Sequence, residues 1–169
     1  YKDIQVEVNF VGGNGHFGND TYRNRWWEPI LSDAIANYST LPKIDFSKQN
    51  LFDAYGYEYV IIIPNNPVYV PWADTIRNFR TAQGIKTGVF TLAQIGGNNV
   101  EGIKAWVTNA YNNWPIKPVA VCLMADYSTD PSGNTGITSK LQPDSGYPDF
   151  ASDNYYADVN NDEMPEIVF

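Results

Sequence analysis

The sequence predicts an α/β domain with a parallel sheet, and the order of its apolar segments carries this prediction. Largely apolar runs at 57–64, 86–92 and 119–125 have the length of buried strands. Amphipathic segments at 71–83 and 100–114 separate them and are long enough for helices. Because buried strands that alternate with helices pair in parallel through right-handed crossovers, we expect these five elements to form one three-layer subdomain.

A separate, shorter segment precedes this domain. Residues 4–10 alternate apolar and polar side chains, which is typical of a half-buried strand. A glycine-rich loop at 12–18 follows, and residues 30–38 then have the pattern of a short amphipathic helix. We place the domain boundary so that 1–52 are the tail of a preceding region with its linker and 53–169 are the α/β domain.

Both helices of the α/β domain have recognisable ends. Pro71 suits the first turn of the first helix, where a backbone N–H is not needed, and Gly84 ends it. Trp72, Ile76 and Phe79 share one face of that helix. Pro115 stops the second helix. The apolar stripe of the second helix consists of Val100, Ile103, Val107, Ala110, Tyr111 and Trp114.

Binding sites in parallel sheets lie just beyond the carboxyl ends of the strands. Asp126 follows the third strand at this edge. Residues 128–150 are rich in Asp, Ser, Gly and Pro and predict a long loop, which in a compact domain is usually functional or mobile. The acidic turn at 158–166 is positioned to reach the same edge.

Composition excludes several classes of protein. The 169 residues carry a formal net charge of −8, which argues against a nucleic-acid partner, because such proteins present a basic patch. The longest apolar runs, at 60–63 and 119–125, are far too short to span a membrane. The single cysteine excludes an internal disulfide.

Three patterns are only weak indications of chemistry. Residues 13–18 match G-x-G-x-x-G, but a polar stretch follows where a dinucleotide site needs a helix. Cys122 lies within a strand, where a thiol is normally inert, and His16 belongs to the other segment. Asp126 is placed like a receiver-domain phosphoacceptor, but the first strand is not followed by acidic residues that would hold Mg²⁺. We therefore predict no catalytic residue in this chain.

The last eighteen residues, 152–169, are dense in carboxylates. Asp158, Asn160 and Asp162 have the spacing of the first ligands of a calcium loop, but Glu163 stands where an EF-hand requires glycine. Such a turn is either a site for a hard cation, which takes oxygen ligands, or a solvated acidic turn. The residues alone leave both interpretations open.

Seven short motifs are weak singly but informative in their order and spacing. They are YEYVII at 57–62, QGIKT at 83–87, IGG at 95–97, IKA at 103–105, AYNNW at 110–114, SDNYY at 152–156 and DEMPEI at 162–167. The set resembles the start of the catalytic domain of gingipain-type cysteine peptidases.

This resemblance implies a caspase-like α/β domain with flavodoxin-like strand order, of which the chain is the first of two similar subdomains. The family's catalytic histidine and cysteine lie in the second subdomain, so the chain alone is expected to be inactive. The second subdomain would be its partner, and peptides or proteins would be substrates of the intact parent. Residues 1–52 would end a prodomain-like region. The parent would be a secreted or cell-surface protein of a bacterium.

The resemblance also implies a structural calcium site. The ligands that it implies are the carboxylates of Asp126, Asp162 and Glu166 and the carbonyl oxygens of Val159 and Met164. Asp158 and Asn160 lie outside this set. Because the ion would bind only the folded state, it would stabilise the fold and fasten residues 128–150 to the sheet edge.

Two other functions fit the same residues. The chain is alternatively a calcium-stabilised extracellular binding or adhesion module, with aromatic side chains such as Tyr155 and Tyr156 contacting a partner. It is also compatible with part of a catalytically dead peptidase homologue.

Overall fold

The computed structural model describes residues 25–40, 43 and 54–169. The chain divides into two compact units, Tyr1–Phe46 and Ser47–Phe169, and each is described by itself. The strand expected at 4–10, the glycine-rich loop at 12–18 and the boundary after residue 52 lie outside the described residues.

The described part of the first unit is helical. α1 spans Trp27–Ala34, and a 3-10 helix, η2, follows at Tyr38–Thr40. The predicted amphipathic helix is therefore present, but it begins at Trp27 and ends before Ile35, whose backbone is extended. None of the residues of α1 is buried.

The second unit is built on a parallel sheet with the strand order β2-β1-β3. The strands are β1 at Tyr59–Ile63, β2 at Thr87–Thr91 and β3 at Ala120–Leu123. Ile61 lies opposite Val89 on one side and Cys122 on the other. An isolated parallel bridge between Ala120 and Val168 extends the pairing on the far side of β3. The predicted parallel α/β fold is confirmed.

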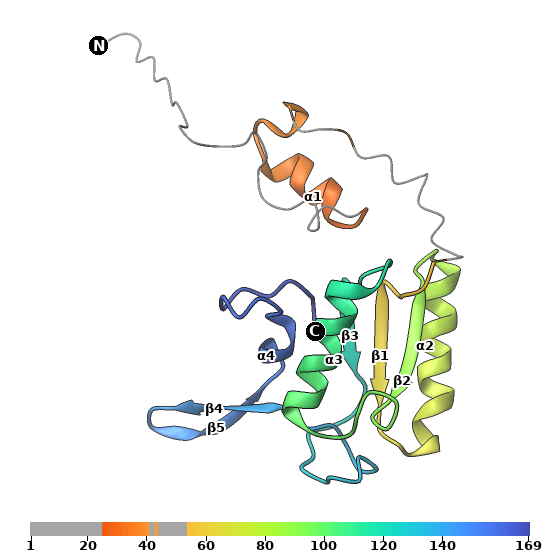
Figure 1. Cartoon of the computed structure of the whole chain (residues 1–169), viewed down its shortest axis with the longest axis vertical. Helices are drawn as coiled ribbons and strands as arrows, with labels where there is room; N and C mark the ends of the chain where they lie inside the picture. Colours follow the sequence, from red (N-terminus) through yellow and green to blue (C-terminus); the bar gives the residue numbers. More distant parts are fainter. Residues whose placement is uncertain (1–24, 41–42, 44–53) are drawn as a thin grey trace. The chain divides into compact units, whose positions relative to one another are not determined.

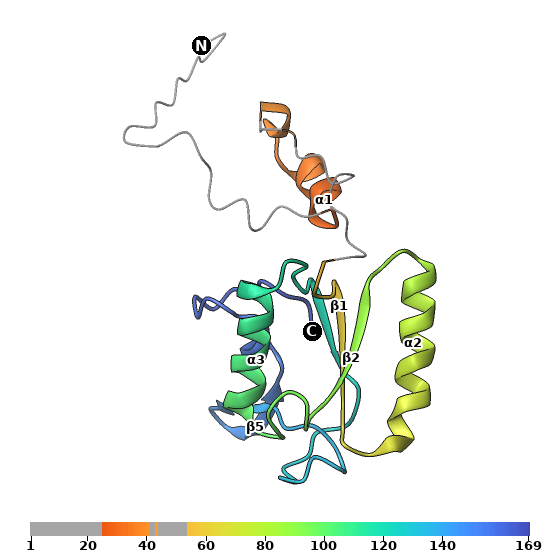
Figure 2. The ribbon, with the colours of Figure 1, turned by 45° about the vertical axis from the view of Figure 1, so that its right-hand side comes forward.

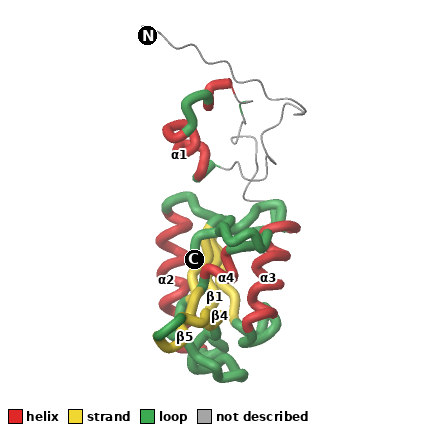
Figure 3. Tube along the Cα trace, turned by 90° about the vertical axis from the view of Figure 1, so that its left-hand side faces the viewer, coloured by secondary structure: helices red, strands yellow, loops and turns green. Residues whose placement is uncertain are grey.

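Helices cover both faces of the sheet. They are α2 at Val70–Ala82, preceded by the 3-10 helix η4 at Pro67–Tyr69, α3 at Val100–Asn113 and α4 at Asn154–Ala157. Figures 2 and 3 show α2 on one face of the sheet and α3 on the other. α4 packs against α3 on the second face. The unit is therefore a three-layer arrangement.

The α3 face holds the larger part of the core. Ile103, Val107 and Ala110 of the predicted stripe are completely buried against the sheet. Trp114, at the end of that stripe, joins a set of edge-on aromatic contacts with Trp106 at 5.3 Å between ring centroids. Such T-shaped pairs contribute about 0.5–1.5 kcal/mol beyond their buried area.

The α2 face is covered more thinly. Ala73 is the buried residue of α2, and Ile76 packs partly against the sheet. Trp72 and Phe79, which share a face with Ile76 in the sequence pattern, are 66% and 60% exposed. The face of α2 that meets the sheet is therefore the one that carries Ala73 and Ile76, and the two large rings stay accessible to solvent.

The segment at 128–150 differs from the predicted long loop. It contains an antiparallel hairpin made of β4 at Lys140–Asp144 and β5 at Tyr147–Ser152. Figure 1 shows this hairpin extending away from the sheet. The loop prediction is wrong here because Pro143 and Pro148 argue against strands in a sheet interior, whereas a projecting two-stranded hairpin tolerates them.

Candidate metal centre

The turn between α4 and the end of the chain brings three carboxylates together. One oxygen from each of Asp158, Asp162 and Glu166 lies within 4.8 Å of the others. Asp158 and Glu166 are half-buried, and Asp162 is exposed. Like charges 4 Å apart repel by about 1 kcal/mol in water and about 4 kcal/mol near a protein surface, so the turn needs compensating donors or cations.

Glu166 receives several of these donors. Its carboxylate accepts hydrogen bonds from the backbone N–H of Val159 at 2.7 Å and of Asn160 at 3.2 Å. The side-chain amide of Asn160 donates to the same carboxylate at 2.9 Å. Glu166 therefore ties the end of the turn to its start at Val159 and Asn160, and it also contributes an oxygen to the cluster.

Asp158 organises the other side of the turn. Its carboxylate accepts the backbone N–H of Asp162 at 3.0 Å and of Glu163 at 3.2 Å. Asn161 and Glu163 have positive φ angles of 58° and 70°. A left-handed backbone costs about 1–2 kcal/mol for a residue such as glutamate, so the turn maintains a strained path that gathers its carboxylates.

The structure places the predicted ligands in two regions. Asp162 and Glu166 meet, and Val159 and Met164 belong to the same turn. Asp126 lies beyond the end of β3 and is exposed, and its carbonyl oxygen accepts the N–H of Ile137 at 3.0 Å. Its carboxylate is not part of the described three-carboxylate group, whereas Asp158, which the resemblance leaves outside the ligand set, is a member.

Lys104 is a residue of this site that the sequence reasoning missed. It lies on α3, is only 7% exposed, and its ammonium donates to the carbonyl oxygens of Tyr155, at 2.7 Å, and Asp158. Burial lowers the pKa of Lys104, while the nearby carboxylates of Asp158, Glu166 and Glu101 oppose that shift. A lysine between Val100 and Val107 on an apolar stripe was the available signal, because a buried lysine requires acceptors.

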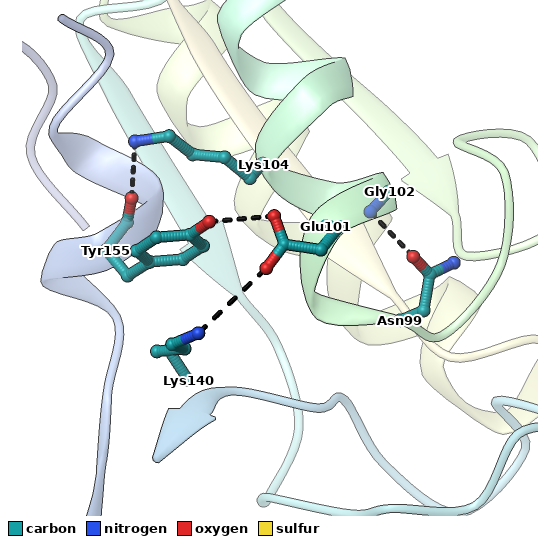
Figure 4. Close-up of polar contacts among 6 residues, drawn as sticks. All are labelled: Asn99, Glu101, Gly102, Lys104, Lys140 and Tyr155. Atoms are coloured by element: carbon teal, nitrogen blue, oxygen red, sulfur yellow. Dashed lines mark hydrogen bonds and ion pairs between the residues drawn. The ribbon is translucent and has the colours of Figure 1, made fainter. Parts of the chain in front are cut away.

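Tyr155 connects this lysine to the rest of the face (Figure 4). Its hydroxyl donates to Glu101 at 2.8 Å, and this bond, more than burial, raises the pKa of Tyr155. The ammonium groups of Lys104 and Lys140 lie 4.9 and 5.0 Å from the centre of its ring. Lys140 also lies 4.0 Å from the Glu101 carboxylate. The network joins α3, α4 and the base of the hairpin.

The carboxyl ends of the strands are occupied by the chain that follows β3. The side chain of Asn98, after β2, donates to the carbonyl oxygens of Asp130, at 2.7 Å, and of Ser128 and accepts the N–H of Thr138 at 2.8 Å. Asn65, after β1, donates to the carbonyl oxygen of Ser132 at 2.7 Å. Two asparagines thus fix the loop at 126–138 across this edge.

Cys122 lies in β3 and is half-buried on the α2 side of the sheet. Its neighbour Tyr59 has a raised pKa because of burial and of the adjacent Cys122, with Arg80 opposing. His16, the single histidine of the chain, lies outside the described residues.

The donors in the acidic turn suit a hard cation. All three gathered side chains offer carboxylate oxygens, which Ca²⁺ and Mg²⁺ prefer over softer metals. The ammonium of Lys104 does not balance the charge of the three gathered carboxylates, so a divalent ion would relieve their repulsion. The residues present therefore fit the calcium ion that the sequence resemblance implies.

Comparison with known proteins gives one match. The family model described as peptidase family C25 matches residues 53–169. No curated protein and no solved structure matches the chain. Within the described part of the chain, the helices are too short or too polar to cross a bilayer.

Proposed function

Since the chain belongs to peptidase family C25, the gingipain family of cysteine peptidases, we propose that it is the non-catalytic, calcium-stabilised portion of a secreted cysteine endopeptidase. The observation that carries the calcium part of this proposal is the meeting of Asp158, Asp162 and Glu166 in one strained turn. Family members are usually bacterial and extracellular, and millimolar extracellular Ca²⁺ suits sites of modest affinity.

Calcium would stabilise the turn by neutralising its carboxylates and bonding their oxygens. Asp162, Glu166 and the carbonyl oxygens of Val159 and Met164 would hold the ion from the turn. The remaining carboxylate is either Asp126, from the end of β3, or Asp158, which already lies in the cluster. The chain's own contribution is to preform the turn through the hydrogen bonds to Asp158 and Glu166.

The ligand set is tested by the Ca²⁺ dependence of thermal unfolding. The full chain, treated with EDTA, should melt at a higher temperature after Ca²⁺ is added. Asp158→Asn and Asp126→Asn are isosteric changes that remove one charge each. The variant that loses the Ca²⁺-dependent rise identifies the remaining ligand. The proposed ligand set would be contradicted if the Ca²⁺-dependent rise in melting temperature persisted in both variants or were absent in the parent chain.

The proposed lack of catalysis has a separate test. In the intact parent, a cysteine activated by a histidine would attack the peptide carbonyl and form an acyl-enzyme. Cys122, half-buried in β3 beside Tyr59, is not placed for that role. Active-site titration of this chain with a thiol-directed peptidyl reagent should show no stoichiometric burst. A burst that disappears in Cys122→Ser would place catalysis in this chain and contradict the proposal.

A further inference from the structure

We infer that Lys104 is the positioning residue of the acidic turn: its buried ammonium holds the end of α4 in the conformation that gathers the three carboxylates. This inference rests on the proposed cation site for its consequence, but its structural part stands without any ion. The contacts of Lys104 point to the role, because its ammonium is placed between two carbonyl groups rather than against a carboxylate.

The two carbonyl groups lie where α4 ends. α4 is a single turn, Asn154–Ala157, and Asp158 is its C-terminal capping residue. The last carbonyl groups of a helix have no partner within the helix. A cationic donor placed there satisfies them and interacts favourably with the negative end of the helix dipole. Lys104 donates to the carbonyl oxygens of Tyr155 and Asp158 and therefore fixes both ends of this last turn.

Asp158 connects the contacts of Lys104 to the acidic turn. Its backbone oxygen bonds to Lys104, while its carboxylate accepts the N–H groups of Asp162 and Glu163. The carbonyl oxygen of the preceding residue, Ala157, accepts the N–H of Glu166 at 3.0 Å. A shift of the end of α4 would therefore move all three carboxylates. Preorganisation of this kind raises affinity, because the apparent dissociation constant is the intrinsic one divided by the fraction of molecules in the competent conformation.

If Lys104 acted on the site only through its charge, its removal would change cation affinity in the opposite direction. An ammonium near a divalent ion repels it, so removing the charge alone would tighten cation binding. Lys140 serves as the matched control, because its ammonium lies as close to the ring of Tyr155 as that of Lys104 does. Its side chain is 41% exposed, and it approaches the Glu101 carboxylate instead of α4 carbonyl groups.

The test compares Lys104→Met and Lys140→Met by hydrogen exchange in the cation-free full chain. In K104M we expect the amides at 158–166 to exchange about tenfold faster or more, with β1 amides unchanged; K140M should match the parent chain. Unchanged exchange at 158–166 in a folded K104M would overturn the inference.

If K104M does not fold, Lys104→Arg is tested instead, because the planar guanidinium cannot occupy the compact position between both carbonyl groups. Faster exchange confined to 158–166 in K104R supports the positioning role, and parent-like exchange refutes it.

Calcium titration of the same proteins separates the two proposals. If the parent chain binds Ca²⁺, we expect K104M to bind about tenfold or more weakly through the lost preorganisation. Equal or tighter binding in K104M would contradict the positioning role and leave the cation site standing. If the parent chain binds no Ca²⁺, the proposed site fails, while the exchange experiment still decides the role of Lys104.

Discussion

Tyr156 illustrates how single polar groups hold α4 in place. Its side chain is completely buried, and its hydroxyl donates to the carbonyl oxygen of Thr138 at 2.9 Å. Burial first, and then the nearby acidic side chains, raise its pKa well above the ordinary value of 10.0. The neutral form of the phenol is therefore favoured in the folded protein.

This shift predicts a loss of stability at alkaline pH. Because the pKa of Tyr156 is higher in the folded than in the unfolded chain, its contribution is complete below pH 10 and declines as pH rises above that value. We expect the midpoint of urea unfolding to fall above pH 10 and Tyr156→Phe to flatten that fall. A parent chain and a Tyr156→Phe variant with the same alkaline slope would contradict this assignment.

Residues on regular stripes could be predicted, and those whose role depends on tertiary partners could not. Ile103 and Val107 are buried as the 3.6-residue pattern of α3 indicates. Lys104 interrupts that stripe and so signals a buried cation, but the carbonyl groups that accept its ammonium lie more than fifty residues later, where no local pattern identifies them. Asp158 lies outside the predicted ligand set for the same reason, because its place in the cluster follows from a turn with two left-handed residues.

At the scale of elements, the loop at 126–138 depends on Asn98. Replacing Asn98 by alanine leaves the N–H of Thr138 without its side-chain acceptor, whereas the carbonyl oxygen of Asp130 keeps the N–H of Gly133. Each buried group left unsatisfied costs about 1–3 kcal/mol. We expect Asn98→Ala to lower the free energy of unfolding by about that amount and to make the loop sensitive to protease.

The matched control for this variant is Asn113→Ala. Asn113 lies exposed at the end of α3, and its amide donates to the side chain of Asn109 at 2.8 Å. It should leave both the unfolding free energy and the cleavage pattern of the loop close to those of the parent chain. Equal protease resistance of Asn98→Ala and Asn113→Ala would show that Asn98 does not hold the loop.

Gly88 in β2 is required by its neighbours rather than by its backbone angles. A Cβ atom there would lie 2.6 Å from the ring of Tyr57. That ring cannot move freely, because it packs edge-on against Phe90 at 5.7 Å and Trp114 at 6.0 Å. Overpacking of this kind typically costs about 1–3 kcal/mol, which we expect for Gly88→Ala in urea unfolding.

The same substitution in a chain without the Tyr57 ring tests why Gly88→Ala destabilises the fold. In a Tyr57→Leu chain the ring is gone, so Gly88→Ala should destabilise by clearly less than in the parent chain. The coupling between the two changes is the measured quantity. Additive losses in the double variant would mean that the Tyr57 ring is not what excludes a side chain at position 88.

Elements with a strong period could be predicted from the sequence, and the hairpin could not. The three strands and α3 follow apolar runs and stripes, which sheet and helix burial require. The strands β4 and β5 contain Pro143 and Pro148 and form no part of the parallel sheet, so their sequences carry neither a buried run nor a clean alternation. For α2 the helix is predictable, but the exposure of Trp72 is not, because Ala73 rather than Trp72 is the residue of α2 that the fold buries.

At the scale of the whole molecule, the family assignment and the fold agree. The match to peptidase family C25 covers residues 53–169, and the parallel order β2-β1-β3 with helices on both faces is the α/β arrangement that the resemblance implied. The formal charge of −8 is partly concentrated in the turn after α4. A bound divalent cation would relieve that concentration and make the stability of the chain depend on calcium.

The calcium site is tested most directly by calorimetric titration of Ca²⁺ into the EDTA-treated full chain, alongside Glu166→Gln and Asp149→Asn. Glu166 contributes an oxygen to the three-carboxylate cluster, whereas Asp149 lies exposed in β5 outside it. We predict a single saturable site that is lost or weakened at least about tenfold in Glu166→Gln and retained in Asp149→Asn. No saturable binding to the parent chain, or equal binding by all three proteins, would contradict the proposed calcium site.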